Sequence, residues 1–214
     1  MDSRNDLLAS LRERTRPLHD AVESLTGGER FLTGEFDPDH YCHFLLTHYL
    51  YHLEVARQVA AWPSLEGNVL DWPDSSRIDG LRDDLDRLGL REATLQTLAP
   101  ITLPLRSPGY ALGLCYVSEG SVLGSKRMYE GLRANSHFNQ IRADRFFRIG
   151  KEGMGGRWKT FLEILLDEAE NHRDEVEEGA VAGFELFGRI WERLGLCSFR
   201  DFQDGGREAT PLVT

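Results

Sequence analysis

Three polar residues near the N-terminus, Arg12, His19 and Glu23, have side chains that together could hold a metal-centred ligand. At about 100° per residue, a separation of seven returns to within roughly 20° of one helical face, and a separation of four to within roughly 40°. The imidazole of His19 could ligate a metal or a heme iron, while Glu23 accepts the other ring N–H. Arg12 could then meet an anionic group at the rim of a flat ligand. Spacing alone favours a simpler interpretation, a surface pair with an unrelated arginine.

A second segment, from Gly109 to Leu132, combines helical periodicity with many glycines. Four of them recur at separations of seven, four and seven and would share one stripe of a single helix: Gly113, Gly120, Gly124 and Gly131. Each glycine inside a helix costs about 0.5–1 kcal/mol relative to alanine. The stripe could let a large planar ligand approach the backbone, with Ser121 and Ser125 beside it to hold water. Close helix packing through small residues explains it equally well.

The elements that must position these residues are helices. Apolar residues recur at helical spacings along most of the chain, and no stretch alternates as a strand would. The main predicted helices are Asp6–Ser24, Asp39–Ala61, Arg77–Leu88, Arg91–Leu98, Gly109–Leu132, Arg157–Val181 and Ala182–Leu194. Pro17 should kink or restart the first helix, and the stretch Thr26–Gly28 should end it. Phe36-Asp37-Pro38-Asp39 resembles a helix start. The last two helices could join at a bend near Gly179 and Gly183. The sequence predicts an all-α, single-domain bundle over residues 1–198, followed by a mobile tail, 199–214.

Composition narrows the class of protein. The chain has 214 residues and a formal net charge of -10, which argues against a nucleic-acid binder and an anionic membrane partner. Its three cysteines match no zinc pattern, and its polar first residues do not form a signal peptide. No apolar run approaches the roughly 20 residues of a membrane span. These features predict a cytoplasmic protein without a membrane partner.

Two other functions also fit a helical bundle. A di-iron oxidase needs paired Glu-x-x-His motifs on facing helices, and the sequence contains none. His48 and His52 lie one turn apart and could form a metal face, but structural or surface histidines are the favoured interpretation. A purely helical interaction module would leave the energetic cost of the glycines unexplained.

Four segments in order resemble the heme oxygenases, especially the bacterial, biliverdin-producing branch. LRERTRPLHDAVESL is similar to the proximal helix with its H-x-x-x-E pairing, and YVSEGSVLGS to the bacterial distal helix. RFFRIGKEGMGGRWKTFLEIL and VEEGAVAGFELFGRIWERL resemble the segments that follow. Together they cover most of the chain from about Asp6 to Leu194. The resemblance implies an all-helical heme oxygenase-like fold with heme between a proximal and a distal helix.

The resemblance also implies roles for individual residues. His19 would be the iron ligand and Glu23 its hydrogen-bond partner. The distal residues that act in catalysis would be Gly120, Ser121 and Gly124. Contacts to the heme propionates would come from Arg12, Tyr116, and Arg157 or Lys159. Phe184 and Trp191 match aromatic positions of the last helix near the pocket, where ordinary core packing is the favoured interpretation.

Two positions depart from the pattern of many family members. This chain has Gly124-Ser125 where many members carry two adjacent glycines. Ser121 stands where the animal enzymes have an aspartate that organises distal water. The bacterial branch commonly shows serine there, so the water network would rest on Ser121 and on backbone groups.

The activity implied is oxidation of heme by dioxygen to biliverdin, with release of carbon monoxide and iron. Heme would be both substrate and cofactor. No Rossmann glycine pattern follows a strand in the sequence, so electrons should come from an external reductase or ferredoxin. Some members of the branch supply phytochromes, which makes a phytochrome system an implied partner. A heme carrier or sensor with little turnover is the alternative on the same fold.

Overall fold

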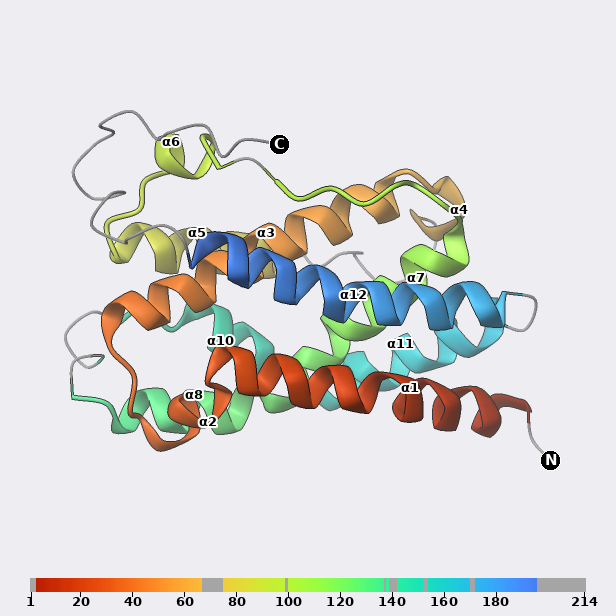
Figure 1. The fold of residues 1–214 in the computed structure, drawn as a ribbon, viewed down its shortest axis with the longest axis horizontal. Helices are drawn as coiled ribbons and strands as arrows, with labels where there is room; N and C mark the ends of the chain where they lie inside the picture. The colour runs from red at the N-terminus through yellow and green to blue at the C-terminus, as the bar shows by residue number, and fades with distance from the viewer. Residues whose placement is uncertain are drawn as a thin grey trace.

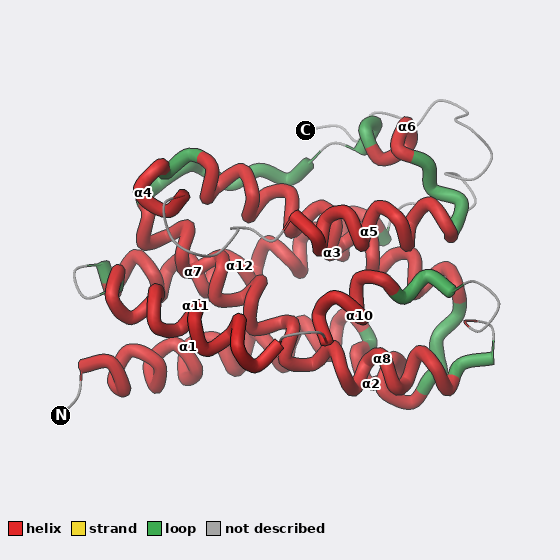
Figure 2. Tube along the Cα trace, turned by 180° about the vertical axis from the view of Figure 1, so that it is seen from behind, coloured by secondary structure: helices red, strands yellow, loops and turns green. Residues whose placement is uncertain are grey.

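The computed structural model describes residues 3–66, 75–98, 100–136, 138, 142–151, 154–169 and 172–195. Over these ranges the chain forms helices and loops and contains no strand (Figures 1 and 2), which confirms the all-α prediction. Within the same ranges, no helix combines the length and the apolar character that a bilayer span needs. The tail predicted for 199–214 lies outside the described residues.

The helices follow one another along the chain. Their bounds are α1 Ser3–Thr26, α2 Gly28–Thr33, α3 Pro38–Ala60, α4 Pro63–Glu66, α5 Ser75–Arg87, α6 Glu92–Leu95, α7 Pro108–Gly120, the 3-10 helix η1 Ser121–Gly124, α8 Ser125–Ala134, α10 Arg145–Lys151, α11 Met154–Glu168 and α12 Arg173–Leu194. Capping residues explain two of the starts. The side chains of Asp37 and Ser107 accept hydrogen bonds from backbone N–H groups in the first turns of α3 and α7, and a proline follows each cap.

The first predicted helix is longer than expected and is not restarted at Pro17, which lies inside α1. The helix ends where the sequence predicts, because Gly27 adopts a left-handed backbone conformation with φ 62°. The six-residue helix α2 follows directly and was not predicted. Its Phe31 is fully buried against other aromatic rings, so tertiary packing supports this short helix.

The predicted boundary between the last two helices is wrong. The sequence suggested Arg157–Val181 and Ala182–Leu194, with a bend at the glycines, whereas α11 ends at Glu168 and α12 begins at Arg173. His172, with φ -134° and ψ 26°, leaves the helical conformation at this turn. Gly179 and Gly183 lie inside α12, where they allow close contacts instead of a bend.

Helix α12 crosses the middle of the molecule (Figure 1) and packs against α1, α3 and α7. Helix α3 contributes a continuous series of buried side chains to the same core, with Tyr41 and Tyr51 among the largest. The core therefore holds α12 from several sides, and α12 in turn positions α1 and α7.

Candidate functional site

Helix α1 packs along α12 in a parallel direction. At the middle of α1, Arg14 Nη1 lies 2.6 Å from Glu177 Oε2. Further along, the ring centroid of His19 lies 5.9 Å from that of Phe184, in an edge-on arrangement. Because residue numbers rise together along both helices, successive turns of α1 face successive turns of α12.

Helix α7 packs along α12 in the same direction, on a different side. A Cβ atom added at Gly113 would lie 2.7 Å from the Cα of Gly179, so the two backbones nearly touch. One turn later, a Cβ atom added at Gly183 would lie 3.0 Å from Val117 Cγ2. Gly183 and Phe184 are neighbours in sequence, so α7 and the His19 region of α1 flank the same turn of α12.

Thr15 of α1 and Tyr116 of α7 link these two helices. The side chains of Tyr116 and Thr15 are hydrogen-bonded, and Arg12 lies near enough to act on the phenol electrostatically. Burial raises the pKa of Tyr116, while the charge of Arg12 and the hydrogen bond with Thr15 oppose this rise. One turn beyond Thr15 is His19, and one turn beyond Tyr116 is Gly120. Since both helices run in the same direction, His19 and Gly120 lie at corresponding levels of α1 and α7. The exposed region that His19, Gly120 and Gly124 border is called the slot below.

The four glycines do not form one stripe, so that prediction is wrong. The α-helix gives way to the 3-10 helix η1 over Ser121–Gly124, which changes the rotation per residue. Gly131 packs tightly, since a Cβ atom there would lie 2.9 Å from the carbonyl carbon of Phe31. Gly113 is equally close to α12. A Cβ atom at Gly124 would meet nothing within 4 Å, and one at Gly120 would meet only Trp158, at 3.8 Å. Two glycines therefore serve packing, and two border open space.

The imidazole of His19 is accessible to a ligand, with 59% of its side chain exposed. Its Nδ1 atom lies 3.7 Å from a carboxylate oxygen of Asp20 and 3.9 Å from one of Glu23. The three side chains form a group that could hold a metal ion. Nδ1 faces the carboxylates and Nε2 has no hydrogen-bond partner within the described ranges, so Nε2 is the nitrogen available to a metal.

A buried ionic cluster lies behind the slot, and sequence reasoning missed it. Glu119, 4% exposed, accepts hydrogen bonds from Arg77 at 3.0 Å and from Arg157 at 2.8 and 3.0 Å. Arg77 also donates to the carbonyl of Ser118. Arg157, predicted to contact the ligand, is therefore bound to Glu119 in this structure. The exposed Ser121 donates its hydroxyl proton to the Ser118 carbonyl at 2.7 Å, which leaves its oxygen free to accept.

His48 and His52 are buried beside this cluster, among aromatic rings of α3, α10 and α12. Burial, reinforced by the charge of Arg77, lowers the pKa of His48 to about 3 and the pKa of His52 well below its usual value. The hydroxyl of Ser118 lies 3.2 Å from His52 Nδ1. Both rings therefore remain neutral at physiological pH.

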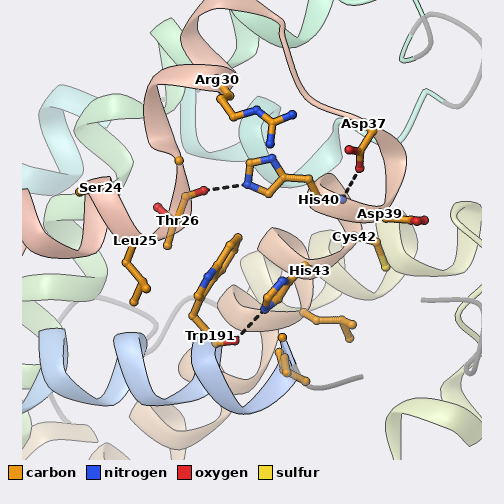
Figure 3. Close-up of a pocket in the computed structure, with 14 residues that line it drawn as sticks. Ser24, Leu25, Thr26, Arg30, Asp37, Asp39, His40, Cys42, His43 and Trp191 are labelled. Atoms are coloured by element: carbon orange, nitrogen blue, oxygen red, sulfur yellow. Dashed lines mark hydrogen bonds between the residues drawn. The ribbon is translucent and has the colours of Figure 1, made fainter. Parts of the chain in front are cut away.

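A cavity of about 500 Å³ opens at the C-terminal end of α1 (Figure 3). Trp191 forms one wall and stacks on His43, with ring centroids 3.8 Å apart. His40 Nε2 lies 2.7 Å from the carbonyl oxygen of Thr26, which ties the start of α3 to the end of α1. Trp191 is therefore part of the wall beyond His19, while Phe184 is the aromatic residue in contact with His19.

Comparisons with known proteins agree with this architecture. The family model described as heme oxygenase matches residues 5–193. Among solved structures, the NO- and CO-bound heme oxygenase from Neisseria meningitidis is similar, with a TM-score of 0.68 and 20% identity. The match covers 90% of this chain and 94% of that chain, and it shows that the two share a fold. No curated protein matches the sequence. Because the family model spans nearly the whole chain, the protein belongs to the heme oxygenase family.

Proposed function

We propose that this protein is an oxygenase that cleaves heme to biliverdin, carbon monoxide and iron, with electrons from an external reductase or ferredoxin. One observation supports the proposal: His19 exposes its imidazole at the level of α1 that corresponds to Gly120, where a Cβ atom would meet only Trp158, and a Cβ atom at Gly124 would meet nothing within 4 Å. A heme would need a donor nitrogen from one helix and a wall without side chains from the other. His19 could supply the nitrogen, and Gly120 and Gly124 could supply the wall.

The proximal side would be provided by α1. Nε2 of His19 would bind the iron, and Glu23 would accept a hydrogen bond from Nδ1–H, which would fix the tautomer and the ring orientation. A neutral imidazole from His19 would hold the iron and leave it able to take up dioxygen. The edge of Phe184 would limit rotation of the imidazole ring.

The distal side would be provided by the end of α7 and by η1. Bound heme supplies the iron at which dioxygen is activated. Gly120 and Gly124 would let the backbone approach that face closely and exclude bulk water, and the oxygen of Ser121 would accept a hydrogen bond from an ordered water molecule. No strong acid side chain is needed there, since water can deliver the proton.

The side of the slot around Tyr116 would set the orientation of the heme. Arg12 and the Tyr116 hydroxyl lie together there and would bind the propionates. Arg157 would act indirectly, because its bond to Glu119 holds the residue that precedes Gly120. The position of the propionates would decide which meso carbon faces the oxygen.

Hemin titration of the purified protein tests the proposal. We expect a saturable spectrum of histidine-ligated heme that His19→Ala loses and that the control His172→Ala keeps, since His172 is an exposed histidine outside the slot. Retention of that spectrum by His19→Ala would refute the proximal assignment. Ascorbate added under air should then convert the bound heme to biliverdin. A heme complex that survives this treatment unchanged would instead identify a heme carrier or sensor.

A further inference from the structure

Five arginines line one concavity beside α8. This concavity lies on the face of α8 opposite to the face that packs against α2. The concavity has a volume of about 590 Å³, and Tyr129, Phe138 and one acid, Asp144, complete its lining. The arginines come from α5, α8, α10 and the segment before α10: Arg87, Arg133, Arg142, Arg145 and Arg148. This concentration of positive charge is unusual in a chain whose net charge is -10.

The ion pairs around the concavity neutralise only part of this charge. Arg145 pairs with Asp83, and Arg148 Nη2 lies 3.9 Å from Asp144 Oδ1. The charge of Arg87 acts on the buried Asp84. Within the described ranges, no ion pair or side-chain hydrogen bond is found for Arg133 or Arg142. These two guanidinium groups therefore add repulsion that a bound anion would relieve.

The backbone beside the concavity is held in a rare conformation. Arg142 has a φ of 52°, which a side-chain-bearing residue seldom adopts. Two contacts fix the chain just after it. The Tyr41 hydroxyl donates a hydrogen bond to the carbonyl of Ala143 at 2.5 Å, and the Asp84 carboxylate accepts hydrogen bonds from the backbone N–H groups of Arg145 and Phe146 at 2.9 and 2.8 Å. Such conformations persist only where surrounding structure imposes them, and they are enriched at functional sites.

We propose that this concavity is a binding site for a small multivalent oxyanion, distinct from the slot beside His19. Guanidinium groups bind phosphate and carboxylate through paired, charge-assisted hydrogen bonds. Several arginines around one hollow favour a compact ligand with at least two negative charges over a single monovalent ion. The phenol of Tyr129 lies in the same lining, on the turn of α8 before Arg133.

Calorimetric titration of the heme-free protein tests this site without reference to turnover. Pyrophosphate and citrate are titrated separately at constant ionic strength. Tighter binding of pyrophosphate would indicate that the natural ligand carries phosphate groups, and tighter binding of citrate would indicate a polycarboxylate. We expect saturable binding with one site per chain. The double variant Arg133→Gln/Arg142→Asn should bind at least about 10-fold more weakly. Asparagine suits position 142 because it tolerates positive φ.

The control double variant Arg189→Gln/Arg106→Gln removes the same charge at exposed positions outside the concavity. It should bind like the unmodified protein. Equal loss in both double variants would show a diffuse charge effect and overturn the proposal, as would the absence of saturable binding to the unmodified chain. Thermal unfolding of each variant checks the fold. Hemin binding should be the same for Arg133→Gln/Arg142→Asn as for the unmodified protein, which separates this site from the proposed oxygenase activity.

Discussion

Gly113 of α7 and Gly179 of α12 face each other so closely that a Cβ atom on the first would lie 2.7 Å from the Cα of the second. No alanine fits between these backbones without moving a helix. Gly124, by contrast, has nothing within 4 Å of its Cβ position. These two glycines, eleven residues apart in the sequence, therefore differ in their surroundings: the first is required by close backbone packing, and the second borders open space.

Gly113→Ala should destabilise the fold. The added methyl group meets backbone atoms, which cannot rotate away, so α7 and α12 must separate and lose packing along their contact. We expect the free energy of unfolding to fall by at least about 2 kcal/mol, measured by urea denaturation. Gly155→Ala is the matched control, because a Cβ atom there also meets nothing within 4 Å. Equal stability of the two variants would contradict the close contact.

Gly124→Val should affect ligand binding and leave the fold intact. The valine side chain would project into open space, so the free energy of unfolding should change by less than about 1 kcal/mol. If heme occupies the slot, the same side chain should reduce hemin affinity at least 10-fold in a spectroscopic titration. Unchanged affinity would mean that heme does not lie against η1.

Glu119→Gln should destabilise the heme-free protein strongly. The substitution leaves the 3% exposed guanidinium of Arg77 without its carboxylate, and removing one partner of a buried ion pair typically costs about 3–5 kcal/mol. Urea denaturation measures the loss. The double variant Glu119→Gln/Arg77→Gln should be less destabilised than the two single losses added together, since the uncompensated charge is gone. Strict additivity would show that the pair contributes little.

Acid should destabilise the protein through His48. The pKa of His48 is about 3 in the folded chain, whereas its ordinary value, which applies to the unfolded chain, is 6.5. As the pH falls below 6.5, the unfolded chain therefore binds the proton before the folded chain does. Stability present above pH 6.5 is then lost by up to about 1.4 kcal/mol per pH unit until the pH approaches 3. His48→Phe, which suits the aromatic surroundings, should show a shallower loss between pH 6.5 and 5 in urea denaturation. Parallel curves would refute the neutral, buried state of this ring.

Asp84 should act in the opposite direction. Burial raises its pKa from 3.8 to about 6, although its hydrogen bonds with the N–H groups of Phe146 and Arg145 oppose the rise. The folded chain therefore binds the proton more readily than the unfolded chain, and this residue adds stability as the pH falls from 6 to 4. As the pH falls over that window, the free energy of unfolding of the unmodified protein should rise by roughly 1 kcal/mol per pH unit relative to that of Asp84→Asn. The exposed Asp86→Asn serves as the control, and a difference that shrinks on acidification would contradict the raised pKa.

Local signals were enough to predict several helices. The stop at Gly27 and the start at Asp37-Pro38 depend on backbone conformation and capping, which neighbouring residues determine. The break at His172 has no proline or glycine to mark it, so local signals did not predict it. The glycines at 179 and 183 led to the wrong prediction of a bend, because glycine in a helix can indicate either a bend or a close contact with another helix.

In the candidate site, too, local features could be predicted from the sequence, whereas contacts between distant segments could not. His19 and Glu23 share a helix, so their proximity follows from spacing. The cluster of Arg77, Glu119 and Arg157 joins three helices, and only Arg157 was singled out from the sequence, for a contact to the ligand. Pairing between such distant segments cannot be read from periodicity.

Helices α1 and α7, which border the slot, both pack against α12. Their alignment therefore depends on the number of residues between their contacts along α12. Gly179 meets α7, and Phe184, five residues later, meets His19. One residue inserted between them would rotate the second contact by about 100° around the axis of α12 and shift it by about 1.5 Å. His19 of α1 and the glycines of α7 would then no longer lie at corresponding levels along α12, although every side chain named in the site would still be present. Deletions and insertions in this short interval should therefore be far less tolerated than substitutions.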